Sequence, residues 1–301
     1  MDPEKTKIGW IGLGKMGLPM ARRFLDGGFP LTVFNRTPGR SRELADLGAR
    51  VAGSPGEAAA ASDLVFTMIA DDTALHAVTM GENGALEAAA AGSVLIDMST
   101  VSPGASAAVA GKASERGVQY LRAPVSGSTR FAEQGALTIF VSGPFEVYER
   151  CTGVLNILGR KLFHVGQAEE ARYLKLLINM MVGTTAMMVA EALTFGEKSG
   201  LSWGQMVDVI GQSVVASPLV GYKTQTLKDR NFTPSFTADQ IAKDFDLALD
   251  TGRSLRVPMP VTALVRQFFE SMKATGRGDL DLFGVVRLLE ELAGIEGAGR
   301  C

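Results

Sequence analysis

The sequence predicts an α/β protein in which a doubly wound N-terminal domain is followed by an all-helical C-terminal domain. Three observations support this prediction. A short apolar run at 8–11 leads into a glycine-rich turn and then into an amphipathic segment. Strand-like apolar runs then alternate with helical segments as far as residue 165, as in a parallel sheet with right-handed crossovers. Beyond Gly166 the pattern changes to long helical periodicity without a clear strand.

The turn near the start of the chain has the form of a dinucleotide-binding loop. It lies between a predicted strand at 8–11 and a predicted helix at 16–25. Gly12 allows the tight turn, Gly14 lets backbone approach a pyrophosphate, and Gly17 lets the helix pack closely on the strand. Glycines alone often make ordinary turns, but the strand–helix setting predicts a nucleotide site. The expected cofactor contacts here are Gly12, Leu13, Gly14, Met16 and Gly17.

The segment after the second predicted strand, 31–34, indicates which dinucleotide is bound. Asn35, Arg36 and Thr37 follow that strand directly. An NAD site usually has an acidic residue here for the ribose 2′-hydroxyl, whereas an amide, a guanidinium and a hydroxyl can each donate to a 2′-phosphate. We therefore expect NADP(H) to be preferred, with NAD(H) as the alternative cofactor. The plainer interpretation is an exposed Arg36 and a Thr37 that caps the next helix.

The remaining elements follow from short apolar runs and from helical periodicity. Strands are expected at 65–69, 94–98, 119–122, 137–142 and 161–165, with an alanine-rich helix at 55–62. The later strands are closely spaced, which favours mixed pairing at one edge of the sheet. Helices are expected at 171–198, 202–212, 237–252, 260–275 and 281–292. We place a Rossmann-type domain at 1–167 and a helical domain at 168–301.

The composition limits the class of function. The chain has 301 residues, of which 46% are hydrophobic, and a net charge of −2, which gives no electrostatic basis for binding nucleic acid or an anionic membrane. Cys151 and Cys301 favour neither a disulfide framework nor a metal site, and His76 and His164 are too few for a zinc cluster. The N-terminal MDPEKTK lacks an apolar signal core. We expect a cytoplasmic protein without a metal.

The apolar helix predicted at 171–198 is long enough to cross a membrane. Its most apolar part, 176–190, is interrupted by Asn179, Gly183 and two threonines, which favours a buried helix over a membrane span. The helix is too apolar to be solvated on most sides, and a second subunit would cover it. We therefore expect a homodimer or homotetramer.

A polar pair on this helix is the strongest candidate for chemistry. Lys175 and Asn179 are four residues apart, so their side chains project from one helix face. Their neighbours are apolar, which predicts a partly desolvated lysine suited to proton transfer. The alternative is a lysine whose stem lies on apolar surface while its ammonium stays in water. The polar pair and its expected place opposite the nucleotide turn count against that alternative, and by themselves they leave both interpretations open.

Five motifs occur in order along the chain. They are GLGKMGLPMA at 12–21, IDMSTVSP at 96–103, APVSGS at 123–128, GQAEEARYLKLLIN at 166–179 and KDFDLAL at 243–249. Together they resemble the β-hydroxyacid dehydrogenase family, which includes 3-hydroxyisobutyrate dehydrogenase. NRT at 35–37, SGSTRFAEQGAL at 126–137 and GDLDL at 278–282 are most similar to its glyoxylate/succinic semialdehyde reductase branch.

The resemblance implies roles for single residues. Lys175 matches the family's catalytic lysine and Asn179 its substrate-orienting asparagine. The implied substrate contacts are Ser126, Gly127 and Asp244, and the further cofactor contacts are Met68, Ile69, Thr100 and Lys243. Plainer alternatives are that Thr100 caps the helix near Pro103, and that Lys243 pairs with Asp239 or Asp246.

Three positions depart from the family pattern. Ile178 stands where many members have a second asparagine, and Ser128 replaces a common glycine. Arg122 stands where members usually carry Asp or Glu, and it would either add positive potential near an anionic substrate or point away. The first two departures bear on the identity of the substrate more than on the reaction.

We expect NADPH-dependent reduction of a small aldehyde acid, such as glyoxylate or succinic semialdehyde, with Lys175 donating a proton to the carbonyl oxygen. One alternative is a 3-hydroxyisobutyrate-type dehydrogenase. Another is an imine reductase or reductive aminase, which shares the two-domain plan and the NRT run but would not usually keep a lysine at 175. A third is a non-catalytic NADP-binding module.

Overall fold

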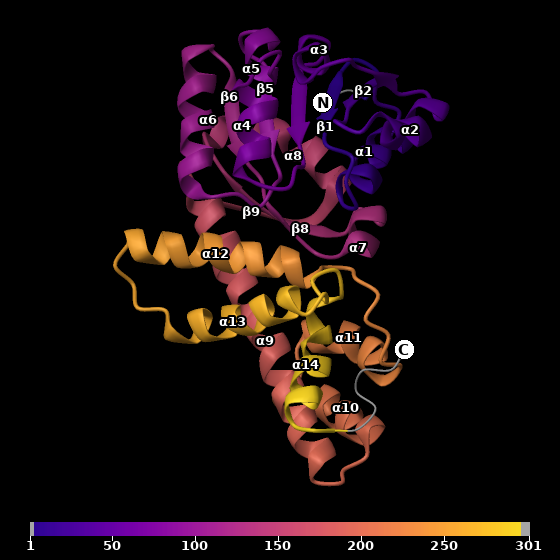
Figure 1. The fold of residues 1–301 in the computed structure, drawn as a ribbon. Helices are drawn as coiled ribbons and strands as arrows, with labels where there is room; N and C mark the ends of the chain where they lie inside the picture. The colour runs from indigo at the N-terminus through magenta and orange to yellow at the C-terminus, as the bar shows by residue number, and fades with distance from the viewer. Residues whose placement is uncertain (1–2, 296–301) are drawn as a thin grey trace. The chain divides into compact units, whose positions relative to one another are not determined.

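The computed structural model describes residues 3–295 and divides into two compact units, Met1–Lys175 and Leu176–Cys301. The first unit alternates strands with helices (Figure 1). The described part of the second unit contains helices and one isolated β-bridge, between Thr237 and Asp281. The predicted fold class, an α/β domain followed by a helical domain, is confirmed. Cys301 lies outside the described residues.

The first unit is built on one sheet. Its strands are β1 Ile8–Ile11, β2 Leu31–Phe34, β3 Arg50–Val51, β4 Leu64–Thr67, β5 Val94–Asp97, β6 Gln119–Arg122, β7 Val125–Ser126, β8 Leu137–Ser142 and β9 Gly159–Gly166. The first six are parallel in the order β3-β2-β1-β4-β5-β6. The strand order reverses between β1 and β4. In open α/β sheets, ligands bind beyond the carboxyl ends of the strands at such a point.

The edge beyond β6 is mixed, as the close spacing of the later strands predicts. β8 runs antiparallel to both β6 and the short β7. β9 pairs parallel with β8 through two irregularities in register. The carboxyl ends of β6 and β8 lie side by side, because Arg122 is paired with Ser142.

Helices cover both faces of this sheet (Figure 1). They are α1 Gly17–Asp26, η1 Pro38–Ser41, α2 Arg42–Asp46, α3 Pro55–Ala60, α4 Asp72–Met80, α5 Ala85–Ala88, α6 Pro103–Glu115, α7 Thr129–Glu133 and α8 Phe145–Leu158. Strand side chains alternate between two cores. Phe66 of β4 belongs to one core with Phe24 of α1 and Val154 of α8, whereas Val65 belongs to the other core with Val109 of α6.

The second unit is a helical bundle with its own core. Its elements are α9 Glu170–Lys198, which begins in the first unit, α10 Trp203–Gln212, α11 Pro218–Lys228, α12 Ala238–Ser254, α13 Pro260–Ala274, η2 Leu282–Gly284 and α14 Val285–Leu292. α9 is long and apolar enough to cross a membrane by composition. However, Ala186, Ala190 and Leu193 of α9 are at most 1% exposed in the core of this unit. Over this stretch α9 is therefore a core helix of the second unit.

A half-buried charge cluster joins three helices of this unit. The guanidinium of Arg230 donates 2.7 Å hydrogen bonds to Glu290 of α14 and to Glu197 of α9, and it stacks 3.8 Å above the ring of Trp203. Glu290 is fully buried. Burial raises its pKa from the ordinary value of 4.5 to about 7, against the lowering effect of Arg230 and with a further rise from Glu197.

This cluster predicts a pH-dependent stability. A carboxyl group whose pKa is raised on folding contributes stability that is complete below about pH 4.5 and is lost as the pH rises through about 7. Glu290→Gln mimics the protonated group. We expect its free energy of unfolding, relative to that of the parent, to increase by roughly 1–3 kcal/mol between pH 5 and 8. Urea unfolding across this pH range measures the difference.

The matched control is Glu291→Gln, because Glu291 is mostly exposed and pairs only at the surface with Arg277. Its stability should follow the parent at every pH. Parallel curves for the parent and Glu290→Gln would contradict the raised pKa.

Candidate active site

The glycine turn between β1 and α1 is closed too tightly to accept side chains. Gly12 has a φ of +100°, and a Cβ there would lie 2.3 Å from the carbonyl oxygen of Met68. A Cβ on Gly17 would lie 2.0 Å from the carbonyl oxygen of Gly12. That oxygen accepts a 2.9 Å hydrogen bond from the indole of the buried Trp10. The turn is thereby fixed against β1 and against the segment after β4.

Gly14 differs, because a Cβ there would meet no protein atom within 4 Å. The side of the loop that carries Gly14 is therefore open, and no packing within the protein requires a glycine there. No side chain caps the start of α1 either, at Met16. An open glycine beside an uncapped helix N-terminus suits the close approach of a pyrophosphate, so this loop fits a dinucleotide.

The Asn35-Arg36-Thr37 segment divides into a supporting residue and two exposed ones. The side-chain oxygen of Asn35 accepts a 2.8 Å hydrogen bond from the backbone N–H of Leu13, and its amide donates at 2.9 Å to the carbonyl of Thr37. Asn35 therefore joins this segment to the glycine loop. Arg36 and Thr37 are exposed, and Thr37 makes no side-chain cap to η1.

The ends of β4 and β5 carry the predicted contacts Met68, Ile69 and Thr100. The carbonyl of Met68 faces Gly12, and the N–H of Ile69 donates at 3.0 Å to the hydroxyl of Ser99. Thr100 follows Ser99 and is half-buried. The side-chain cap of α6 is Ser102 and not Thr100, because the Ser102 hydroxyl accepts from the N–H of Ala105 at 3.0 Å. The three residues therefore lie on two segments joined at the carboxyl edge of the sheet.

Ser126 and Gly127 form the turn after β7. Ser126 ends the strand and is half-buried. Gly127 has a φ of +138°, and a Cβ there would lie 2.8 Å from the side chain of Leu137 and 3.1 Å from Phe131. A glycine is therefore required for the chain to leave the sheet at this point, so the place of the Ser126 hydroxyl depends on it.

The structure corrects both interpretations of Arg122. Arg122 is 7% exposed, so it does not point away into solvent. Its guanidinium donates two hydrogen bonds to one carboxylate oxygen of Glu169 and lies 4.7 Å above the ring of Tyr120. Because Glu169 neutralises the charge locally, Arg122 is a structural partner of the segment that leads into α9 and not a source of positive potential for a substrate.

The candidate catalytic helix α9 carries Lys175 and Asn179 four residues apart. Lys175 is half-buried and Asn179 is 4% exposed. The amide of Asn179 donates to a carboxylate oxygen of Asp244, whose other oxygen lies 3.0 Å from the ammonium of Lys243. This geometry suits Asp244 to holding Asn179 better than to contacting a substrate directly. Asp246, one of the two carboxylates in the plainer alternative for Lys243, pairs with Arg266.

Sequence reasoning missed a buried group at the start of α9. Arg172 is 1% exposed and pairs with Asp97 at the end of β5, which is fully buried. The available signal was an arginine within an apolar run, three residues before Lys175, together with an acidic residue ending a buried strand. The sequence did not indicate that these two residues pair with each other.

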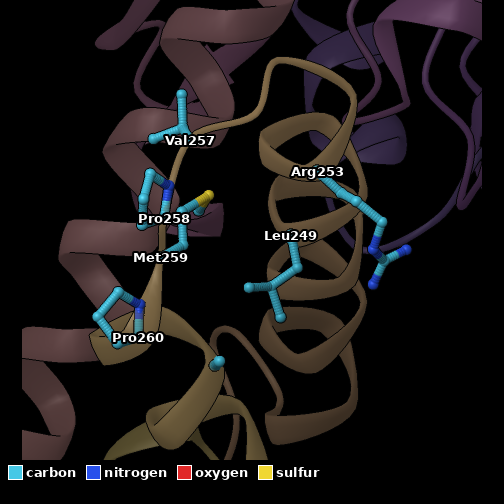
Figure 2. Close-up of a pocket in the computed structure, with 7 residues that line it drawn as sticks. Leu249, Arg253, Val257, Pro258, Met259 and Pro260 are labelled. Carbon is cyan, nitrogen blue, oxygen red and sulfur yellow. The ribbon is translucent and has the colours of Figure 1, made fainter.

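A separate hollow of about 540 Å³ lies in the second unit (Figure 2). It is lined by Leu249, Arg253, Val257, Pro258, Met259, Pro260 and Ala263. Its one charged group, Arg253, pairs with Asp250, and it contains no candidate site residue. Among the described residues, no three His, Cys, Asp or Glu side chains come together as a metal site.

Comparison with known families decides the general identity. Residues 7–166 match the profile of the NAD binding domain of 6-phosphogluconate dehydrogenase, and residues 170–289 match the NAD-binding profile of NADP-dependent 3-hydroxyisobutyrate dehydrogenase. The chain belongs to the 3-hydroxyisobutyrate dehydrogenase-like β-hydroxyacid dehydrogenase family. It is an NAD(P)-dependent oxidoreductase of the hydroxyacid dehydrogenase family that acts on CH–OH groups.

Members of this family resemble the chain over nearly its whole length. It is 36% identical to 2-(hydroxymethyl)glutarate dehydrogenase from Eubacterium barkeri, covering 98% of this chain and 99% of that protein. It is 32% identical to the chloroplastic glyoxylate/succinic semialdehyde reductase 2 of Arabidopsis thaliana, covering 95% and 80%. A Mycobacterium tuberculosis 3-hydroxyisobutyrate dehydrogenase structure superposes with a TM-score of 0.86 at 28% identity, covering 94% and 99%.

Two glycines of the loop predict different outcomes for the same substitution. Gly12→Ala introduces a clash with Met68 and a strained φ, so we expect a loss of stability on the order of 1–3 kcal/mol together with loss of NADPH binding. Gly14→Ala adds a methyl group on the open side, so we expect about ten-fold or more weaker NADPH binding without loss of stability. Thermal unfolding and NADPH fluorescence titration measure the two effects.

Each variant is the control for the other. Equal losses of melting temperature in both variants would contradict the open face at Gly14. Unchanged NADPH affinity in Gly14→Ala would contradict the place of the dinucleotide.

Proposed function

We propose that the protein reduces a small aldehyde acid to the corresponding hydroxy acid with NADPH. The observation that supports this most is Lys175 beside Asn179 on α9, in a family of NAD(P)-dependent oxidoreductases. The named relatives act on, or are named for, small carboxylic acids with an aldehyde or a hydroxymethyl group. Glyoxylate and succinic semialdehyde are the substrates that the sequence motifs favour.

In the proposed reaction, side chains and backbone groups of the chain bind the substrate and donate the proton. When bound, NADPH would supply the hydride that the carbonyl carbon accepts. Lys175, as an ammonium ion, donates a proton to the carbonyl oxygen as negative charge develops there. Asn179, held by Asp244, orients that oxygen. The Ser126 hydroxyl and the backbone N–H groups of the Gly127 turn hold the substrate carboxylate.

The cofactor is held by the glycine loop and by the strand ends. The proposed contacts of this group are Gly12, Leu13, Gly14, Met16, Gly17, Met68, Ile69, Thr100 and Lys243. Arg36 and Thr37 would select NADP(H), because both are exposed beside the loop and can donate to a 2′-phosphate. Asn35 supports this selection through its hydrogen bonds to Leu13 and Thr37.

We also propose a homo-oligomer in a reducing cytoplasm. Large apolar side chains stay exposed along α9 at spacings of four and seven residues, and these are Leu177, Met181, Met188 and Phe195. Such spacing places them on one stripe of the helix, which suits packing against a second copy. Cys151 is a buried free thiol, as expected where disulfides do not form.

Lys175→Ala tests the proton donor. We expect kcat for aldehyde acids to fall by about 100-fold or more, since general acid catalysis commonly contributes 10²–10⁴-fold, while NADPH still binds. Lys161→Ala, at an exposed lysine of β9, should leave kcat unchanged. Steady-state rates from NADPH absorbance, on a panel of short aldehyde acids, measure both.

A kcat for Lys175→Ala within a few-fold of the parent would remove the proton-donor role. Turnover of ketone plus amine, with none of any aldehyde acid, would instead indicate an imine reductase. NADPH binding without any turnover would indicate a non-catalytic module.

The cofactor preference is tested at Arg36. We expect the parent to favour NADPH over NADH in kcat/KM, and Arg36→Ala to lose about ten-fold or more of that preference, because a guanidinium–phosphate contact is removed. The NADH value should stay near that of the parent, which serves as the internal control. A parent that prefers NADH would contradict the interpretation of the Asn35–Thr37 segment.

A further inference from the structure

Asp97 is the centre of a fully buried polar network at the carboxyl end of the sheet. One of its oxygens accepts from the hydroxyls of Thr67 and Ser99, each at 2.6 Å, and from the Ser99 N–H at 3.2 Å. Its other oxygen accepts from the guanidinium of Arg172. The carboxylate is therefore held by the ends of two strands and by the start of α9.

Arg172 uses the rest of its guanidinium on the same region. It donates to the Ser99 carbonyl at 2.7 Å, to the Ser106 hydroxyl at 3.1 Å and to the Tyr120 hydroxyl at 3.1 Å. Burial raises the pKa of Tyr120 to about 12, so this hydroxyl remains neutral. Burial works against the charge of Arg172, but Asp97 and Tyr120 offset it, and the pKa of Arg172 is raised.

Packing alone does not explain this arginine. A buried ion pair costs desolvation energy, and an apolar side chain of similar volume often serves stability equally well. The guanidinium adds direction, because its planar fork fixes several acceptors at once. Here those acceptors lie on β5, β6, α6 and the segment after β5. The network specifies the place of the first turn of α9.

Two proposed functional residues are close along the chain to members of this network. Lys175 is three residues after Arg172 on α9, about 4.5 Å along the helix axis. Thr100 follows Ser99, whose hydroxyl, N–H and carbonyl are all engaged by Asp97 or Arg172. A change in the Asp97–Arg172 pair would therefore move the lysine and the proposed cofactor contact relative to each other.

We propose that Arg172 is a positioning residue, which holds Lys175 in register with the Ser99–Thr100 segment through Asp97 and the Ser99 carbonyl. The inference deepens the proposed function and rests on it, since it concerns the lysine assigned there as proton donor. Arg172 touches neither substrate nor cofactor in this proposal and acts through the helix that carries Lys175.

Arg172→Lys tests the proposal, because it keeps the charge but loses the planar fork. A misplacement near 1 Å can cost about 100-fold in rate, so we expect kcat to fall by about ten-fold or more. We expect KM to change by less than about three-fold, and the solvent deuterium isotope effect on kcat to rise as proton transfer becomes limiting. Arg230→Lys makes the same substitution at a half-buried arginine that pairs with Glu197 and Glu290, and it should leave kcat and the isotope effect unchanged.

A second readout needs no turnover. Competitive acylation with limiting acetic anhydride, read by mass spectrometry, compares the reactivity of Lys175 with that of the exposed Lys161. We expect the ratio of Lys175 acylation to Lys161 acylation to rise by about three-fold or more in Arg172→Lys, because the first turn of α9 loosens. The ratio should stay at the parent value in Arg230→Lys.

The outcomes separate this proposal from the proposed function. A parent without reductase turnover removes the proposed function, while the acylation ratio still decides whether Arg172 positions Lys175. A parent-like ratio and isotope effect in Arg172→Lys overturn the positioning role, even if the melting temperature falls. If Arg172→Lys does not fold, Asp97→Asn keeps the side-chain volume but removes the charge that Arg172 pairs with. It should raise the ratio of Lys175 to Lys161 acylation in the same direction, and a parent-like ratio there overturns the proposal.

Discussion

The first unit depends on one buried carboxylate. Asp97 ends a fully buried strand, where an unpartnered charge would cost several kcal/mol. The fold supplies its partners from β4, from the segment after β5 and from the start of α9. Arg172 is on the first turn of α9, so its pairing with Asp97 also fixes where this helix begins. The burial of Asp97 therefore constrains the helix that carries the candidate residue Lys175.

The candidate site contains two kinds of residue: some position other residues of the site, and others are accessible for contact with a ligand. Asn35 joins two loops, and Asp244 holds Asn179. By contrast, Arg36 is exposed and Lys175 is half-buried. A family resemblance assigns both kinds of residue to one site without separating them. The hydrogen bonds separate them, since a buried group with satisfied partners is suited to support and an accessible one to contact a ligand.

The sequence predicted the local parts of the fold best. The glycine turn and the alternation of strands depend on residues close in sequence, and both are found in the structure. The segment predicted as one helix at 281–292 instead starts with a short 3₁₀ turn, because the Asp281 side chain bonds the N–H of Phe283 and pairs with Lys223. Lys175 and Asn179 were visible as polar residues in an apolar helix. Arg172 was not, because its partner Asp97 is 75 residues away and only the folded sheet brings them together.

The Arg122–Glu169 pair constrains how the chain can evolve. The family resemblance implies an acidic residue at position 122, so this chain carries a reversed charge there, and Glu169 answers it from 47 residues away. Changing either residue alone would leave a buried charge without its counterion, at a cost of about 3–5 kcal/mol. That is a large share of the 5–15 kcal/mol by which domains are usually stable. The two positions are therefore coupled, and a tolerated change of charge at one requires a compensating change at the other.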